Sequence, residues 1–508
     1  MPRSDDPVAA YSAGRPLPLA PALIRQMRTG TEQVTQHSIG RRSGFHGIIP
    51  SYLRPLVRAY LLGYASSVAP RIINAVLAYF AACRRQRRGD SPRRAAELSL
   101  ARLRDSIRHV LRSGLELHRF PTFCAALVGG STLFTSKQTT AFNGSVATKA
   151  TNDTTGKANA TARNRPNTAL AATQDAALTT AAVPCAGRTL DLTLFAVTRA
   201  LDVVVGELWA RRRQRKVAAG SWTGLEALVG RLTDSAIFAS SSALVMWAWF
   251  YVPSRLPHAY NKWITSAAAV DARLIDALRL CRAGQLQYGK DTGPRARLLQ
   301  GMAHDYKWPL RWGDPAVTVP FPCTMVHMDC GPSCEYHALV RFLRSWRWSV
   351  ATYLPLSLLL VLRRPNRNLR GIRQAVLSAM RSSVFLATFI TLFFYGVCLA
   401  RSRIGPLVLG KSVAARQAID SGLCTAVGCG LCGWSILIEP ASRRKDMGLF
   451  VAPRALATLF PRRYALDKQW RETLVFAASS AIVFTASQEN PKRVRGVLGK
   501  ILKFVLVP

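Results

Sequence analysis

Acidic residues are scarce in this chain. Its 508 residues include 27 Asp and Glu against 69 Lys and Arg, so the formal net charge is +42 and the isoelectric point is near 11.1. Such an excess of cations is typical of proteins that bind nucleic acid or an anionic membrane surface. Yet 49% of the residues are hydrophobic, and they gather in blocks separated by arginines. This layout indicates a multi-span membrane protein with basic loops.

The usual sequence signatures of enzymes are also missing. The chain has no Walker motif, no dinucleotide-binding glycine pattern, no nucleophile elbow and no pair of carboxylates poised for acid–base chemistry. We therefore predict no catalytic residues and no enzymatic activity. The 11 cysteines are an odd, scattered set with no disulfide framework. No apolar segment follows a basic N-terminus, so we expect no cleaved secretory signal.

Polar and apolar stretches alternate along the chain and divide it into parts. We predict a disordered basic tail (1–48), a first transmembrane half (49–252) with a low-complexity polar insert (135–183), a soluble linker with a Cys/His-rich cap (253–345), a second transmembrane half (346–487) and a basic amphipathic tail (488–508). One surface helix is expected over Tyr260–Gly284. The expected spans are Leu190–Trp209, Ser235–Val252, Trp346–Leu362, Ser383–Ala400, Ile419–Ile438, Gly448–Phe460 and Trp470–Ser487. The apolar stretch from Ile49 to Cys83 is expected to form one long broken helix or two short ones, partly in the membrane.

An internal repeat relates the two halves. Asp191–Leu201 and Asp446–Leu456 share the pattern D-x-x-L-F-x-x-x-R-A-L, and Phe238–Ala243 resembles Phe476–Ala481 further along. A weaker match upstream keeps the same order. The predicted fold class is therefore all-α: a polytopic integral membrane protein with two related halves of several transmembrane helices each. The counterpart of the glycine-rich span Ile419–Ile438 should fall within 135–183, so either a span has been lost there or the insert is translated non-coding sequence.

A cluster of cysteine and histidine precedes the second half. It consists of Cys323, His327, Cys330, Cys334 and His337. These residues supply enough soft ligands for a tetrahedral zinc site, although their spacing matches no known zinc module. The alternatives are a disulfide, from Cys334 to either Cys330 or Cys323, or free buried thiols. We therefore predict no cofactor, and zinc is the one candidate that the cluster would suit.

Charges embedded in apolar runs are a second group of candidates. Arg199, Asp202, Glu207 and Arg454 are expensive to expose to lipid, so we expect them to line a polar groove between the halves. The alternative is a set of internal structural ion pairs.

Small residues in the glycine-rich span form a third group of candidates. Gly422, Ala426, Gly430 and Gly433 predict close helix packing. Cys429 and Cys432 have the spacing of a redox pair, but helix packing is the stronger interpretation because they lie within an apolar span.

Several of these motifs together resemble a known family. The run from Cys323 and His327 to Cys330-Gly-Pro-Ser-Cys334, followed by a basic segment and Tyr353-Leu-Pro-Leu, resembles the N-terminal Cys-rich domain of the transmembrane protein 135 family, in particular its fungal-type members. Arg58-Ala-Tyr-Leu-Leu-Gly-Tyr64 and Tyr260-Asn-Lys-Trp-Ile264 fit the same picture. The resemblance covers most of residues 50–500 except 135–183, and the missing first-half span is its chief departure.

The resemblance implies an organelle membrane protein. The family is similar to peroxisomal membrane protein 4 and, remotely, to the channel subunits of the mitochondrial inner-membrane translocase. It implies a polytopic protein of peroxisomes or mitochondria that takes part in lipid handling or organelle dynamics, with no catalytic residues to carry over.

These observations together predict a non-enzymatic membrane scaffold or passive pathway. Its partners would be membrane lipids and other organelle membrane proteins or a second copy of itself, with no nucleic acid. The alternative is a metal- or redox-sensing membrane regulator that acts through the Cys323–His337 cluster. A soluble nucleic-acid binder, favoured by charge alone, is the other rival.

Overall fold

The protein is helical throughout the part of the chain that the structure describes. The computed structural model describes residues 50, 53–86, 92–116, 121–129, 190–293, 298–328, 330–362, 368–461, 464, 466–490 and 493–506. No strand occurs among them, which confirms the all-α prediction for these residues. The predicted basic tail (1–48) and polar insert (135–183) lie outside the described residues.

Three helical stretches of the described chain are long and apolar enough to cross a membrane. They are Arg54–Phe80, Leu369–Val408 and Val413–Ile438, with 27, 40 and 26 residues. Each exceeds the ~20 residues that a transmembrane helix needs. The other predicted spans are helical too, but they are not among these three.

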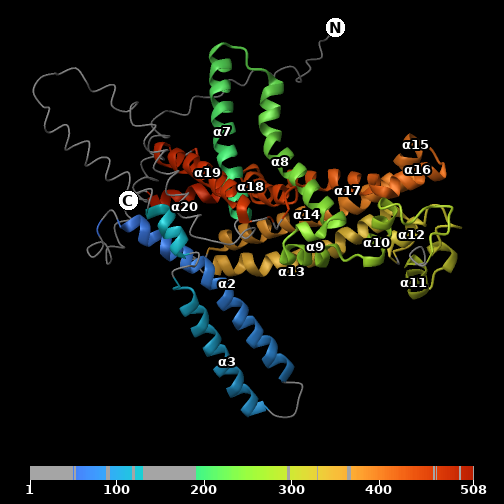
Figure 1. Cartoon of the computed structure of the whole chain (residues 1–508), viewed down its shortest axis with the longest axis horizontal. Helices are drawn as coiled ribbons and strands as arrows, with labels where there is room; N and C mark the ends of the chain where they lie inside the picture. Colours follow the sequence, from blue (N-terminus) through green and yellow to red (C-terminus); the bar gives the residue numbers. More distant parts are fainter. Residues whose placement is uncertain are drawn as a thin grey trace, which may run out of the picture.

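Helices α13 (Cys334–Leu362) and α14 (Leu369–Leu399) run side by side along the long axis of the molecule (Figure 1). Helix α17 (Cys424–Cys432) packs on α14, and α8 (Gly224–Tyr251) packs on α17. Leu386, Ile390, Phe393 and Val397 recur every three or four residues, so they share one face of α14. All four are buried in the central hydrophobic core.

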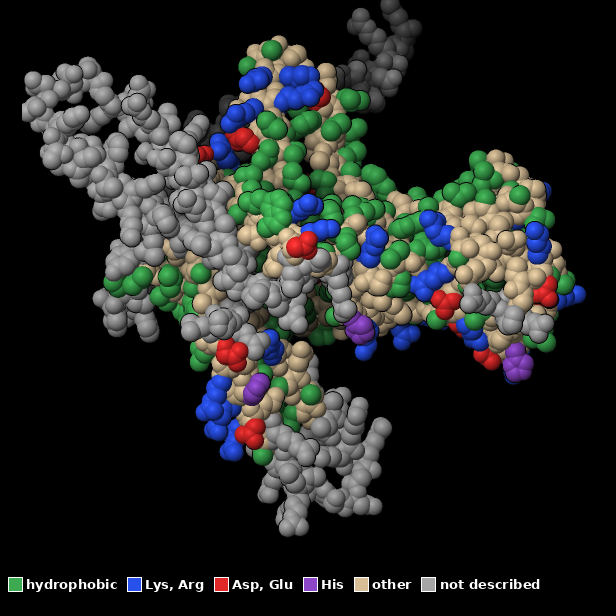
Figure 2. All heavy atoms as spheres, viewed as in Figure 1, with side chains coloured by type: hydrophobic (Ala, Val, Ile, Leu, Met, Phe, Trp, Pro, Cys, Tyr) green, Lys and Arg blue, Asp and Glu red, His purple; other side chains and the backbone are tan. Residues whose placement is uncertain are grey.

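Two helical hairpins project from this bundle on opposite sides (Figure 1). Helices α2 (Arg54–Gln86) and α3 (Pro92–Ser113) form one, and α7 (Leu190–Ala218) and α8 form the other. Figure 2 shows hydrophobic side chains along the α7–α8 hairpin below a basic tip. Exposed apolar side chains on these two helices include Leu201, Val205, Leu208, Leu225 and Leu228. Such a face is suited to contact with lipid.

Helices near the C-terminus pack against the first half of the chain. Helix α7 packs on α19 (Gln469–Glu489), α18 (Ala441–Ala457) packs on both α7 and α8, and α20 (Gly496–Leu506) packs on α2. Residues 121–129 form a further short helix. Leu502 and Val505 of α20 are buried, so the predicted amphipathic tail covers an apolar surface of this chain.

The predicted soluble linker takes part in the central core. Its helices before α13 are η1 (Pro253–Arg255), α9 (His258–Ala268), α10 (Ala272–Arg282), α11 (Leu298–Asp305), η3 (Leu310–Gly313) and α12 (Cys323–His327). The single surface helix expected over 260–284 is wrong. Ala269 ends α9 in a left-handed conformation (φ 45°), and Asp271 caps α10 by accepting a hydrogen bond from the Arg273 amide. Buried Leu278, Met302 and Met325 join these elements to the core.

The chain between α14 and α18 is broken into short helices. These are η4 (Ala400–Ile404), α15 (Gly405–Val408), α16 (Val413–Ala418), η5 (Ile419–Leu423), α17 and η6 (Gly433–Ile438). One more short helix, η7 (Leu466–Lys468), lies after α18 and directly before α19. Gly422 interrupts the predicted span Ile419–Ile438 with φ 144°, a conformation that other residues rarely adopt. The kink brings Asp420 into the core beside the end of α14, where Arg401 binds it.

Candidate metal centre and apolar cavity

Cys323 and His327 stand at the two ends of α12. Their spacing of four residues places both side chains on one face of this single turn, and Cys323 Sγ lies 3.5 Å from His327 Nε2. Pro322 precedes the turn and Met328 ends it in a left-handed conformation (φ 48°). The short helix therefore presents a thiol and an imidazole side by side.

Two more cysteines complete the cluster from other helices. Cys334 is the first residue of α13, and its Sγ lies 3.9 Å from that of Cys323. Cys398 stands near the end of α14, with its Sγ 3.7 Å from Cys323 Sγ and 3.5 Å from His327 Nε2. All four ligand atoms lie within 4.8 Å of one another, so the group can hold a metal ion. His327 and Cys398 are fully buried, and the other two are half-buried.

The hydrogen bonding of His327 favours a role as a ligand. Its Nδ1 lies 2.8 Å from the carbonyl oxygen of Gly331. A proton on Nδ1 donates to this oxygen and leaves the Nε2 lone pair directed at the three sulfur atoms. Gly331 adopts φ 80°, which turns the loop back toward the ring.

The surroundings favour a thiolate at Cys323. Its hydrogen bond with Cys398, then that with His327 and the charge of Arg401, lower the pKa of Cys323 to about 4. Burial lowers the pKa of His327, but hydrogen bonds with Cys323 and Gly331 outweigh burial and raise it overall. Burial and the neighbouring Cys323 charge raise the pKa of Cys334. Thiolates are the form in which cysteine binds metals.

Two of the residues that the sequence indicated do not join this group. His337 packs its ring on that of His327, with centroids 4.5 Å apart and planes at 20°. Burial lowers the pKa of His337 to about 3, and neither of its ring nitrogens has a hydrogen-bond partner among the described residues. Cys330 lies in the loop between α12 and α13, outside the four-ligand group. Cys323, Cys330 and Cys334 are free thiols in this structure, the state that the sequence left open as one alternative to a metal site.

A buried ion pair stands beside the cluster. Arg401 Nε and Nη2 bind the two carboxylate oxygens of Asp420 at 2.6 and 2.9 Å, and Nη2 also donates to the Phe321 carbonyl. Tyr288 donates its hydroxyl to Asp420. The pair therefore ties the end of α14 to η5 and to the segment that enters α12. It fixes the backbone on both sides of Cys398 and Cys323.

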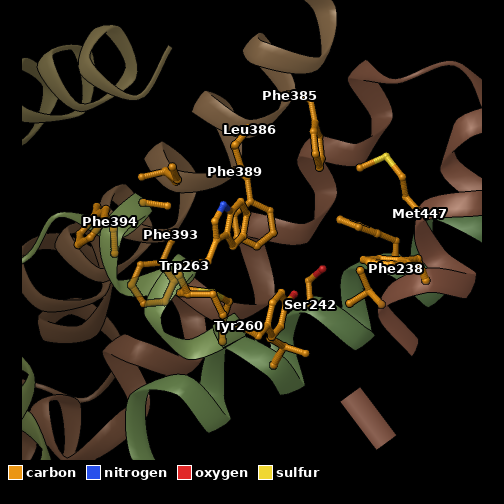
Figure 3. A pocket seen from close by; sticks show the side chains of 18 of the residues that line it. Phe238, Ser242, Tyr260, Trp263, Phe385, Leu386, Phe389, Phe393, Phe394 and Met447 are labelled. Atoms are coloured by element: carbon orange, nitrogen blue, oxygen red, sulfur yellow. The ribbon is translucent and has the colours of Figure 1, made fainter. Parts of the chain in front are cut away.

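An apolar cavity lies further along the bundle, among α8, α9, α13, α14 and α18 (Figure 3). Its volume is about 370 Å³. Phe238, Phe385 and Phe393 are buried in its wall, whereas Trp263 and Phe450 are 42% and 54% exposed and stand at its rim. The lining is mostly aromatic and aliphatic, and Ser242 is among the few polar groups.

The embedded charges fall into two places. Asp202 lies 4.0 Å from Arg495, and Glu207 pairs with Arg211 at 2.9 Å and with Arg493 at 3.2 Å. Arg199 is buried and reaches the Arg495 carbonyl. These three predicted groove residues therefore gather where α7 meets the C-terminal segment. Asp202 and Glu207 form ion pairs there, which is the alternative that the sequence left open, and Arg199 binds a backbone carbonyl. Arg454 lies apart from them, on α18 beside the cavity.

The small residues of the glycine-rich stretch differ in how closely they pack. Gly433 packs closely, because a Cβ there would lie 2.5 Å from Ala239 Cα. Ala426 and Gly430 face outward, and Gly422 serves the kink. Within this chain the close approach to α14 occurs instead at Gly428, where a Cβ would lie 2.7 Å from the Phe393 carbonyl. Cys429 and Cys432, the weaker redox candidates, are buried free thiols on this same helix.

Sequence reasoning missed Cys398. It stands in an apolar helix far from the Cys/His cluster in the chain, and nothing in its local sequence marks it as a ligand.

Comparisons with known proteins add no relative: no family model matches the chain, and no curated protein or solved structure is significantly similar to it.

Proposed function

We propose that the chain is a non-enzymatic, polytopic membrane protein of peroxisomes or mitochondria that binds an apolar solute as a scaffold or passive pathway in lipid handling. The observation that carries this proposal is the aromatic cavity among α8, α9, α13, α14 and α18. Ligand cavities of ~300–1,000 Å³ lined by apolar side chains are typical of small-molecule sites. At about 370 Å³, this cavity suits one narrow ligand.

Helix pairing supports the idea of two related halves. In the repeat, α7 corresponds to α18 and α8 to α19. The packing of α7 on α19 is then the counterpart of the packing of α18 on α8, and both pairs occur. Arg199 and Arg454 also share a local geometry, since each lies over the phenylalanine four residues before it, at 5.1 and 3.8 Å. This reciprocal pairing of equivalent helices supports an internal duplication of the kind found in many transporter folds.

Three apolar helical stretches and the resemblance to the transmembrane protein 135 family support the membrane and organelle assignments. Membrane lipids would then be the main partners. The proposal predicts that the tagged chain resists an alkaline carbonate wash and follows a peroxisomal or mitochondrial marker. Release by salt alone would overturn it and favour a nucleic-acid or peripheral role.

Occupancy of the cavity is tested with a neutral probe, a photoactivatable palmityl alcohol, on the purified full-length protein. We expect labelling of peptides from α8 and α14. Ala267 lines the cavity, so Ala267→Phe should abolish this labelling, whereas Ala283→Phe, at an exposed position outside it, should not. Equal labelling of both variants, or labelling confined to other helices, would contradict the proposal.

The cluster of Cys323, His327, Cys334 and Cys398 favours a second function, as a zinc-dependent or redox-dependent regulator. A tetrahedral zinc site with Zn–S bonds of about 2.3 Å and a Zn–N bond of about 2.0 Å has S···S edges of about 3.8 Å and S···N edges of about 3.5 Å. Cys323 Sγ lies 3.7 Å from Cys398 Sγ and 3.9 Å from Cys334 Sγ, and His327 Nε2 lies 3.5 Å from the Sγ atoms of both Cys323 and Cys398. These are four of the six ligand–ligand distances of the group, and all six are within 4.8 Å.

Zinc would join α12, the start of α13 and the end of α14. In its absence, hydrogen peroxide can oxidise the Cys323 thiol and a neighbouring thiol to a disulfide and is itself reduced to two molecules of water. Metal analysis and thiol counting on protein purified with and without a chelator separate the two possibilities. Bound zinc with protected thiols supports the zinc centre, and rapid peroxide-dependent loss of two thiols supports the redox role.

A further inference from the structure

Arg454 stands at the rim of the apolar cavity. Its guanidinium carbon lies 3.8 Å from the centre of the Phe450 ring on its own helix and 5.8 Å from the centre of the Tyr260 ring on α9. Both rings line the cavity. Tyr260 in turn stacks on Trp263, with the planes 6° apart. The charge is therefore held at the entrance by aromatic groups from two helices.

This guanidinium has no acidic partner among the described residues. Its one hydrogen bond runs from Nη1 to the Phe450 carbonyl, one turn back on the same helix, at 2.6 Å. Arg199, its counterpart in the repeat, has by contrast Asp202 and Asp446 near enough to act on its charge. Arg454 is half-buried and its hydrogen bond to Phe450 is solvent-exposed, so its remaining N–H donors are accessible to a ligand at the cavity entrance.

The shape and polarity of the cavity define the rest of the ligand. Its wall beyond the rim is apolar, with Phe238, Phe385 and Phe393 each at most 5% exposed. A volume of about 370 Å³ has room for one hydrocarbon chain and not for the two chains of a diacyl lipid. A single guanidinium at the entrance matches a carboxylate, which it can bind through two parallel hydrogen bonds.

We propose that the cavity binds a long-chain fatty acid, with its hydrocarbon tail among the aromatic side chains and its carboxylate on Arg454. This inference rests on the proposed function, because it specifies the ligand class of the same cavity. It assigns Arg454 as the headgroup anchor.

The test compares two photoactivatable probes on the purified full-length protein, palmitic acid and its neutral methyl ester. Arg454→Gln removes the charge and keeps an amide of similar length. Arg471→Gln is the matched control, because Arg471 also stacks on an aromatic ring, that of Trp470 at 5.6 Å, but lies outside the cavity lining. Thermal unfolding of each variant reports whether the fold is kept.

We expect the wild type to bind the acid more tightly than the ester, and R454Q to weaken acid binding about tenfold to a hundredfold, as the loss of one charge-assisted interaction implies. Ester binding and the R471Q variant should be unchanged. Equal affinity of both probes, or an equal effect of R454Q and R471Q, would overturn the anchor and leave the cavity proposal intact. Failure of both probes to label α8 or α14 would overturn the cavity itself.

Competition identifies the headgroup. Unlabelled palmitate should displace the acid probe more effectively than lysophosphatidate, whose phosphate and glycerol need more space and more than one cation. A stronger effect of lysophosphatidate would overturn the assignment to a fatty acid in favour of a phosphate-headed lipid.

Discussion

Removal of one cluster cysteine tests the metal centre directly. Cys398→Ser takes away the ligand that α14 contributes, and the hydroxyl that replaces the thiol is a poor zinc ligand. Cys330→Ser is the matched control, because Cys330 is a free thiol of the same Cys/His segment but lies outside the four-ligand group. If the metal joins the cap to α14, only the first change should uncouple the protein from zinc.

The size of the effect follows from mass action. A metal that binds only the folded protein, at a thousandfold excess over its Kd, stabilises it by about 4 kcal/mol. For a domain of roughly 250 residues, each kcal/mol shifts Tm by about 2 °C. We therefore expect a zinc chelator to lower the Tm of the wild type by about 8 °C. In the Cys398→Ser protein the chelator should change Tm by less than about 1 °C, since the bound state is already lost.

The assay is thermal unfolding of the detergent-purified chain with and without chelator, alongside zinc analysis by mass spectrometry. About one zinc per chain is expected in the wild type and in Cys330→Ser, and little in Cys398→Ser. A wild type whose Tm ignores the chelator and which contains no zinc would refute the metal centre. A loss of zinc from Cys330→Ser equal to that from Cys398→Ser would refute this choice of ligands.

Other predictions follow from packing and charge. Asp420→Asn should lower the free energy of unfolding by about 3–5 kcal/mol, because it leaves the buried charge of Arg401 without its partner. Chemical unfolding measures this loss, with the exposed Asp467→Asn as the control. Equal stability of the two variants would contradict the prediction. Gly433→Ala should cost about 1–3 kcal/mol, since its Cβ would lie 2.5 Å from Ala239 Cα, whereas Gly430→Ala has open space and should be neutral or stabilising. A greater loss for Gly430→Ala would show that the outward face of α17 packs against something else. Gly428→Ala should resemble Gly433→Ala, because the Phe393 carbonyl blocks its Cβ.

The helices were predictable because their signal is local. A long apolar run such as Ser383–Ala400 predicts a helix by itself. The helix in the structure, α14, begins earlier, at Leu369, because its first turns contain arginines that hydropathy does not mark as part of a span. The break between α9 and α10 was missed because alanine gives no warning of a left-handed conformation at Ala269. Which side of the glycine-rich helix packs was also beyond the sequence. Small residues stand on several of its faces, and only the position of α14 selects Gly428.

The candidate metal centre shows the same limit at a single site. Cys323 and His327 share a helical turn, and Cys334 follows after a short loop, so their proximity is written in local spacing. The fourth ligand depends on how α14 packs beside α13, which no local pattern encodes. Spacing alone also indicated His337 as a possible ligand, but in the structure its ring packs on that of His327.

The position of Cys398 has a consequence for what the centre can do. It stands within the apolar stretch Leu369–Val408, three residues before Arg401, whose ion pair with Asp420 anchors the end of that stretch. Phe393 and Phe394, one turn earlier, line the cavity. A metal ion or a disulfide at Cys398 would therefore act on the same helix that forms the cavity wall. If the two sites are coupled, a chelator should weaken labelling by the neutral palmityl probe in the wild type and leave it unchanged in Cys398→Ser. Equal labelling of the wild type with and without chelator would mean that the cluster stabilises the cap without influencing the cavity.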